Sequence, residues 1–135
     1  GSDTSTNVAG NLVFYAFHSV QGYSKMGSYI GNGNADGTFV YTGFKPRYIL
    51  SKNSAASTSW VITDTTRSPY NVTSNWLGSN DAAAEQSYTY FDILSNGFKA
   101  RNASNWVNGS GNNHIYMAFA EAPLVGTNNV PANAR

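Results

Sequence analysis

The stretch Asn113–Pro123, NHIYMAFAEAP, decides the fold, because a close copy of it occurs near the other end of the chain. The copy is Asn11–Val20, NLVFYAFHSV, and both follow the pattern Asn, any residue, Val or Ile, Phe or Tyr, Tyr or Met, Ala, Phe. In each copy the apolar residues are consecutive and polar, turn-forming segments flank them, which is typical of a strand buried on both faces. We therefore expect residues 11–20 and 113–122 to form central strands. A chain bounded by two such strands suggests the last strand of one unit, followed by one whole unit of a tandem array.

The composition excludes several function classes. The 135 residues are enough for one domain with one core. Charged residues make up 11% of the chain and the net charge is +1, with Lys45, Arg47 and Lys52 as the nearest thing to a basic group. Because phosphate binding needs clustered Lys and Arg, we expect no nucleic-acid partner. No apolar run approaches the roughly 20 residues that span a bilayer, so we expect no membrane insertion. The absence of cysteine excludes disulfides and thiolate metal sites.

The ends of the chain differ in character from its centre. Gly1-Ser2 without a Met resembles the remnant of a cleaved tag, so we expect a parent protein that continued upstream. The sequence thus predicts a tag remnant and flexible lead over residues 1–10, one β-sandwich domain over residues 11–125, and a polar tail over residues 126–135.

Between the two copies, short apolar segments alternate with turn-forming residues. Asn32-Gly33, Asp36-Gly37 and Asn96-Gly97 favour tight turns, and the last of these predicts a type I′ hairpin. Asn80–Gln86, NDAAAEQ, is the one helix candidate. The predicted strands are residues 39–41, 47–52, 60–63, 88–94 and 98–101, with a weakly alternating segment at 22–29. This spacing predicts an all-β, antiparallel, jelly-roll-like β-sandwich with at most one short helix.

Catalytic and metal-binding patterns are weak in this sequence. His18 and His114 occupy different positions of the two copies, so we interpret both as structural residues. No HExxH, GxSxG or phosphate-binding glycine loop is present. Seven carboxylates could include a glycosidase pair, but no spacing indicates which two. We therefore expect a non-enzymatic protein with no cofactor and no metal site, and keep a polysaccharide depolymerase fragment as an alternative.

Aromatic side chains beside polar residues are the better candidates for ligand binding. Sugars offer an apolar ring face surrounded by hydroxyls, which suits aromatic rings with amides and hydroxyls nearby. Most such rings nonetheless cover the domain's own core or a subunit interface. Asn32, Asn34 and Asp36 resemble an oxygen-rich loop with too little charge for tight Ca²⁺ binding, so turn chemistry explains them as well. Asp64 and Arg67 could bind a ligand or simply brace their loop. The candidate ligand-binding residues are Tyr23, Tyr29, Asn32, Asn34, Asp36, Asp64, Arg67, Tyr70, Trp76 and Trp106.

Four segments together resemble a known family: GYSKMGSYIGNGNADGTFVYTGFKPRYILSK, WVITDTTRSPYN, FDILSNGFKAR and the closing IYMAFAEAP. From Asn11 to Arg135, the order of these segments resembles that in a carboxyl-terminal β domain of large structural proteins of tailed bacteriophages, which are named tail or tail-fibre proteins. The function of that domain is undescribed. In that family the strand equivalent to Asn11–Val20 ends a preceding repeat. The resemblance implies a virion-associated β domain and carries over no catalytic residue.

The resemblance leaves two main hypotheses. The first is a receptor-binding module that recognises bacterial surface polysaccharide through loop aromatics and Asn or Asp side chains. The second is a purely structural fibre or decoration domain that contacts other virion subunits. Phage fibres are commonly trimeric, so the resemblance implies a homo-oligomer on the virion, while the sequence itself does not fix the symmetry.

Overall fold

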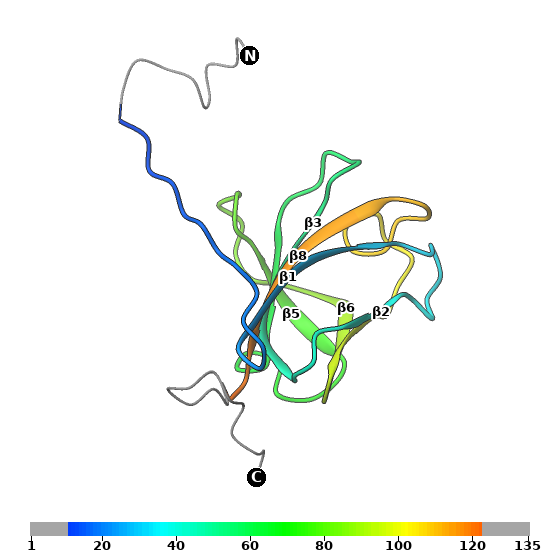
Figure 1. Cartoon of the computed structure of the whole chain (residues 1–135). Helices are drawn as coiled ribbons and strands as arrows, with labels where there is room; N and C mark the ends of the chain where they lie inside the picture. Colours follow the sequence, from blue (N-terminus) through cyan, green and yellow to red (C-terminus); the bar gives the residue numbers. More distant parts are fainter. Residues whose placement is uncertain (1–10, 123–135) are drawn as a thin grey trace.

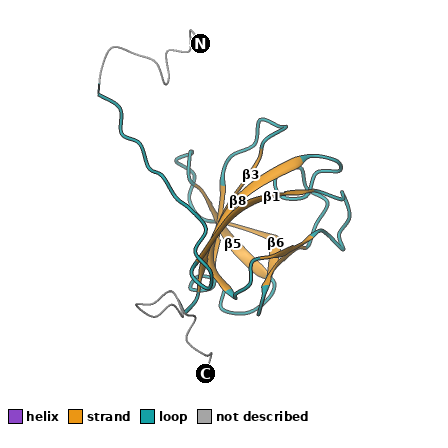
Figure 2. Ribbon diagram, viewed as in Figure 1, coloured by secondary structure: helices purple, strands orange, loops and turns teal. Residues whose placement is uncertain are grey.

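The computed structural model describes residues 11–122, and this part of the chain is built from strands and loops without a helix (Figure 2). Nothing in it is therefore a helix long and apolar enough to cross a membrane. The eight strands are β1 (Ser24–Ile30), β2 (Phe39–Tyr41), β3 (Pro46–Asn53), β4 (Val61–Asp64), β5 (Thr73–Gly78), β6 (Gln86–Leu94), β7 (Gly97–Ala100) and β8 (Asn113–Ala120).

All strand pairs are antiparallel and form one sheet in the order β1-β8-β3-β4-β5-β6-β7-β2. Strands β3 to β7 follow one another as neighbours, whereas β8 returns to lie between β1 and β3 and β2 pairs with β7. Figure 1 shows β1, β8 and β3 side by side at one end of this order. The fold is the expected all-β, antiparallel architecture, in a nearly closed form whose two end strands are β1 and β2.

Aromatic rings fill the space between the two halves of the sheet. Phe98 on β7 lies 5.3 Å from Tyr116 on β8 and 5.9 Å from Tyr29 on β1, measured between ring centroids. Phe91 on β6 packs against Phe98 at 5.1 Å. Because β7 and β8 are far apart in the strand order, these contacts require the sheet to fold over onto itself. The interior contacts thus explain the sandwich character of the domain.

The predicted central strand at Asn113–Ala122 is confirmed as β8, but the prediction for Asn11–Val20 is wrong for this chain. Residues 11–19 form no strand, and only Val20 makes a β-bridge, to Ser24. Figure 1 shows this segment, in blue, running away from the sheet. The central position that its sequence suits is already occupied by β8, which is hydrogen-bonded on both edges.

The helix predicted for Asn80–Gln86 is also wrong. Residues 79–85 form the connection between β5 and β6, in which the Asp81 carboxylate accepts a hydrogen bond from the Ala83 backbone N–H at 2.9 Å. Gln86 already belongs to β6, paired with Trp76. So short a segment has too few backbone bonds to offset helix nucleation once its last residue joins a strand.

The hairpin predicted at Ser95–Phe98 is present, with a different turn. Leu94 pairs directly with Gly97, so Ser95 and Asn96 are the two turn residues and Gly97 begins β7. Gly97 is not among the glycines with positive φ, so the type I′ prediction for Asn96-Gly97 is wrong. A glycine is needed there because a Cβ atom would lie 2.1 Å from the carbonyl oxygen of Val40 on β2.

The remaining strand predictions hold within one or two residues, apart from β5, which was not predicted. The segments predicted as a flexible lead, residues 1–10, and as a polar tail, residues 126–135, lie outside the described residues.

Candidate functional site

Four aromatic side chains from two neighbouring strands and one loop surround a shallow pocket of about 280 Å³. Trp76 comes from β5, Tyr88 and Tyr90 from β6, and Trp106 from the loop between β7 and β8. The aromatic pocket is lined by Trp76, Gln86, Ser87, Tyr88, Tyr90, Ser104 and Trp106. It combines aromatic faces with amide and hydroxyl groups and contains no charged side chain among these residues.

Strand periodicity explains why the β5 and β6 side chains meet. Trp76 pairs directly with Gln86 across the two strands, and alternation then places Tyr88 and Tyr90 on the same face as Gln86. Phe91 points to the opposite face, where it packs against Phe98. The predicted alternation of β6 is therefore confirmed, and its tyrosine face is the wall of the aromatic pocket.

The rings are arranged in an inner and an outer pair. Trp76 and Tyr90 are 3% and 4% exposed, and their ring centroids lie 5.4 Å apart at an angle of 62°. Tyr88 is 54% exposed and lies 5.3 Å from Tyr90, while the partly buried Trp106 lies 5.2 Å from Trp76. The buried pair thus packs against two outer rings, of which Tyr88 is exposed and Trp106 is partly exposed.

A series of short polar turns holds Trp106 in place. The Ser104 hydroxyl accepts a hydrogen bond from the Trp106 backbone N–H at 3.2 Å, and the Ser104 backbone N–H donates to the Asn102 side chain at 2.8 Å. The backbone carbonyl of Asn105, the residue between Ser104 and Trp106, accepts a hydrogen bond from the Asn53 side-chain amide on β3 at 2.6 Å. Trp106 is therefore presented by a loop whose conformation is fixed from both sides.

Two polar groups of the inner pair have distinct chemistry. Burial raises the pKa of Tyr90 to about 12, with the neighbouring Tyr88 contributing, so its hydroxyl stays protonated at neutral pH. The indole N–H of Trp76 is buried and has no hydrogen-bond acceptor among the described residues. Buried donors of this kind normally have a partner, so the Trp76 N–H is an exception among the buried polar groups of the core.

The structure uses Asn32, Asn34 and Asp36 within their own loop. The Asn32 and Asn34 side-chain oxygens accept hydrogen bonds from the backbone N–H groups of Asn34 and Asp36, at 2.9 and 3.0 Å. Asp36 forms an ion pair with Lys99 on β7, which lowers the pKa of its carboxyl group. The Asn32 and Asn34 oxygens are thus committed to turns, as turn chemistry predicts, and the Asp36 carboxylate is committed to Lys99.

Asn108, which the sequence did not single out, connects that loop to the one that carries Trp106. Its fully buried side-chain amide donates to the Asn32 side-chain oxygen at 2.8 Å, to the Asn34 carbonyl at 2.8 Å and to the Asn102 carbonyl at 2.9 Å. Its side-chain oxygen accepts from the Asn32 backbone N–H at 3.0 Å. One side chain therefore fixes two loops to each other.

Asp64 and Arg67 form the loop brace that the sequence left as one of two alternatives. The Arg67 Nε donates to the Asp64 Oδ2 at 2.6 Å, and the Asp64 Oδ1 accepts from the backbone N–H of Arg67 at 2.8 Å and of Thr66 at 2.9 Å. Desolvation raises the pKa of Asp64, but these hydrogen bonds and the Arg67 charge outweigh it, so the pKa is lowered. The carboxylate is saturated by its own loop.

Tyr29 lies in the core. Its hydroxyl donates to the Val107 carbonyl at 2.6 Å, burial raises its pKa, and its ring stacks on that of His114 with centroids 5.1 Å apart. His114 is fully buried, whereas His18 is exposed on the extended segment, residues 11–19, that precedes β1. The two histidines therefore do not meet.

Tyr23 and Tyr70 lie away from the aromatic pocket. Tyr23 packs edge-on against Phe119 with ring centroids 5.9 Å apart, and Tyr70 is 84% exposed in the loop before β5. Of the candidate residues, the structure therefore brings only Trp76 and Trp106 into the aromatic pocket. The pocket residues that sequence reasoning missed are Gln86, Ser87, Tyr88, Tyr90 and Ser104; the predicted tyrosine face of β6 was the signal for two of them.

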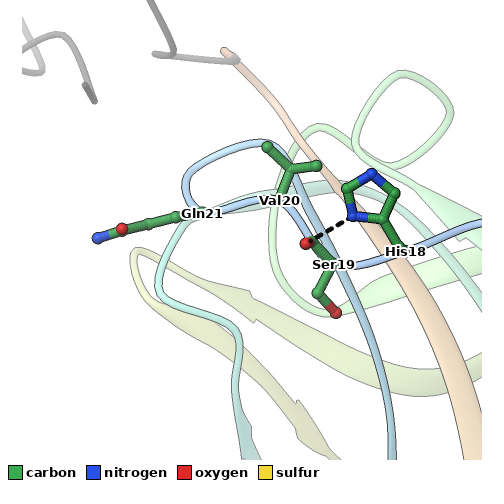
Figure 3. A pocket seen from close by; sticks show the side chains of 4 residues that line it. All are labelled: His18, Ser19, Val20 and Gln21. Atoms are coloured by element: carbon green, nitrogen blue, oxygen red, sulfur yellow. Dashed lines mark hydrogen bonds between the residues drawn. The ribbon is translucent and has the colours of Figure 1, made fainter. Parts of the chain in front are cut away.

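A second pocket, of about 420 Å³, lies where the extended segment turns into β1 (Figure 3). Its described lining is His18, Ser19, Val20 and Gln21. The His18 Nδ1 lies 3.0 Å from the Ser19 carbonyl oxygen, and Figure 3 shows the Gln21 side chain pointing away from the other three. The polar groups do not converge on one point. Within residues 11–122, no group of three or more His, Asp or Glu side chains could hold a metal ion.

Comparison with known proteins gives one match. A search of curated proteins and a search of solved structures each found nothing that matches the chain. A family model described as a domain of unknown function, DUF7483, matches residues 1–123. The match covers the extended segment and all eight strands, and the chain therefore belongs to the DUF7483 family.

Proposed function

We propose that this domain is a non-catalytic receptor-binding module of a tailed-bacteriophage virion, and that its aromatic pocket binds one unit of a bacterial surface polysaccharide. The observation that carries the proposal is the pair of accessible rings, Tyr88 and Trp106, supported from below by Trp76 and Tyr90. The sequence resemblance to phage tail proteins supplies the biological setting.

The chemistry of the pocket suits a sugar. A pyranose ring presents an apolar face to an aromatic ring and directs its hydroxyls outwards, where amide and hydroxyl groups can bind them. Tyr88 and Trp106 offer the ring faces, while Gln86, Ser87 and Ser104 lie in the same lining. A volume near the lower limit for small-molecule sites suits part of a polymer better than a whole, enclosed ligand.

A shallow site of this kind binds weakly by itself. Several copies on one virion would bind a repeating polysaccharide with much higher avidity, because the later contacts form at a high effective concentration. The proposed partner set is therefore a bacterial surface polysaccharide together with other virion subunits, in a homo-oligomer.

Titration of the purified domain with polysaccharide fragments from candidate host bacteria tests the proposal. We expect Trp106→Ala and Tyr88→Ala each to weaken binding about tenfold, equivalent to about 1.4 kcal/mol. Tyr70→Ala removes an aromatic ring that is more exposed than either and lies outside the pocket, and it is the control. Unchanged affinity in both pocket variants would reject this site.

A purely structural role is the second candidate, and the exposed apolar segment at residues 11–17 favours it. Its large side chains are 54% to 86% exposed, as expected of a surface that another subunit covers. This alternative predicts a stable oligomer in solution and no adsorption to cells. A strict monomer that adheres to host cells would exclude it.

A further inference from the structure

The dipeptide Asn-Gly occurs three times in this chain, as Asn32-Gly33, Asn96-Gly97 and Asn108-Gly109. In this dipeptide the backbone nitrogen of the glycine can attack the side-chain carbonyl carbon of the asparagine, because glycine has no side chain to obstruct the approach. The reaction also needs an asparagine side chain that is free to rotate onto that nitrogen. The three sites differ in this respect.

Two of the three asparagine side chains are held by hydrogen bonds. The Asn32 side-chain oxygen accepts from the Asn34 backbone N–H at 2.9 Å, and its amide donates to the Asp36 carbonyl at 3.0 Å. The Gly33 N–H donates to the Asn108 carbonyl at 3.0 Å. The Asn108 side chain is fully buried, and its nitrogen lies within hydrogen-bond distance of three acceptors. Attack at either site therefore requires several hydrogen bonds to break first.

The third asparagine, Asn96, has a free side chain. It is one of the two exposed turn residues between β6 and β7, and its side chain makes no hydrogen bond to any residue in the part of the chain that the structure describes. Its backbone carbonyl oxygen accepts from the N–H groups of Thr42 at 3.0 Å and Gly43 at 3.2 Å. The turn is thus tied to the end of β2 through its main chain, while the Asn96 side chain is free to rotate towards the Gly97 nitrogen.

We propose that Asn96 is a site of spontaneous deamidation whose isoaspartate product weakens the attachment of β2 to β7. The Gly97 nitrogen forms a bond to the Asn96 Cγ, and the side-chain nitrogen leaves as ammonia with the Gly97 proton, which gives a five-membered succinimide ring. Water opens this ring at Cγ to give aspartate, or at the main-chain carbonyl carbon to give isoaspartate. Water is the only co-reactant and no atom changes its oxidation state. Either product lowers the formal net charge from +1 to zero.

The two products affect the hairpin differently. Isoaspartate lengthens the main chain of the turn by one methylene carbon, whereas Gly97 is paired with Leu94 on β6 and with Tyr41 on β2. The carbonyl group that binds the Thr42 and Gly43 N–H groups also leaves the main chain and becomes a carboxylate. Aspartate keeps the original main chain and therefore all of these contacts. The loss of attachment between β2 and β7 is thus specific to isoaspartate.

Incubation of the full chain in mildly alkaline buffer, followed by peptide mapping by mass spectrometry, tests the site. We expect a mass gain of about 1 Da at Asn96, about tenfold faster than at Asn32 or Asn108, which react only after local opening. The urea-unfolded chain is the control, because all three dipeptides are then free and should react at similar rates. Asn96→Gln, which would have to form a six-membered ring, should remove the fast reaction. A folded chain in which Asn96 reacts no faster than the other two would overturn the proposal.

Separation of the two products by ion exchange tests the effect on the hairpin, with isoaspartate identified by its selective enzymatic methylation. We expect the isoaspartate form to unfold at a lower urea concentration than the unmodified chain, with faster hydrogen exchange at the Thr42 and Gly43 amides. The aspartate form and the Asn96→Asp variant share one covalent structure and should match the unmodified chain. An isoaspartate form as stable as the Asn96→Asp variant would also overturn the proposal.

Discussion

The rings of Trp76 and Trp106 lie edge to face, with centroids 5.2 Å apart and planes inclined by 64°, although 30 positions of sequence separate them. This contact joins β5 to the loop between β7 and β8. It gives the two tryptophans different roles, because Trp76 is buried and Trp106 is partly accessible.

Replacing these two tryptophans should therefore separate stability from binding. We expect Trp76→Ala to lower the free energy of unfolding by about 3–5 kcal/mol, since it leaves a large cavity in the core. Trp106→Ala should cost less than half as much, because part of its surface already faces solvent. Urea unfolding of both variants measures the difference, and equal losses would contradict the inner and outer arrangement of the rings.

The buried His114 should make stability depend on pH. Burial lowers its pKa below the usual 6.5, and the positive charge of Lys52 adds to the effect. The native state therefore binds a proton less readily than the unfolded state, so His114 contributes stability above pH 6.5 that is lost as the pH falls towards the native pKa.

Urea unfolding at pH 7.5 and pH 5.5 measures this dependence. We expect His114→Leu to reduce the loss of stability between the two conditions, and His18→Gln, a change at an exposed histidine, to retain it. An undiminished loss in the His114 variant would assign the pH dependence to another group.

We expect Asn108 to contribute strongly to the stability of the domain, although it lies among loops. Asn108→Asp replaces an amide nitrogen, whose two N–H groups are shared among three acceptors, with an oxygen that faces the Asn34 and Asn102 carbonyls. We expect a loss of at least about 2 kcal/mol, because buried partners are left without a donor. The exposed Asn96→Asp is the control. Hydrogen exchange at the Asn32 and Gly33 amides, both bonded to Asn108, should accelerate.

Gly97 should be intolerant of substitution. A Cβ atom there would meet the Val40 carbonyl oxygen at 2.1 Å, so Gly97→Ala must displace β2 from β7. Thermal unfolding should show a loss of about 1–3 kcal/mol, the usual cost of overpacking. Ser95→Ala, in the same turn, is the control. If the Gly97→Ala variant is as stable as the Ser95→Ala variant, the close approach of β2 and β7 is contradicted.

Local sequence patterns predicted most of the strands but not how they surround the pocket. β3, β6 and β8 have apolar or alternating residues that are visible in a short window. β5 has only Trp76 and Leu77 as large apolar residues, and its pairing with β6 contains an irregularity between Thr73 and Asn75, so no regular period exists to be found. The strand is specified by its neighbours β4 and β6.

The candidate site was predicted only as far as residue type allows. Trp76 and Trp106 were named because they are aromatic residues in polar surroundings, and Tyr88 and Tyr90 were placed correctly on one face of their strand. Their meeting depends on the pairing of Trp76 with Gln86 and on the Ser104 turn that positions Trp106. The same criterion selected Tyr29, whose surroundings in the fold are the core.

Adsorption of the fluorescently labelled domain to bacterial strains with and without their surface polysaccharide tests the central claim most directly. We expect strain-selective adsorption that disappears with the polysaccharide, falls with Trp106→Ala and Tyr88→Ala, and persists with Tyr70→Ala. A folded domain, in its native oligomeric state, that adsorbs to no strain or adsorbs equally after both pocket substitutions would contradict the claim.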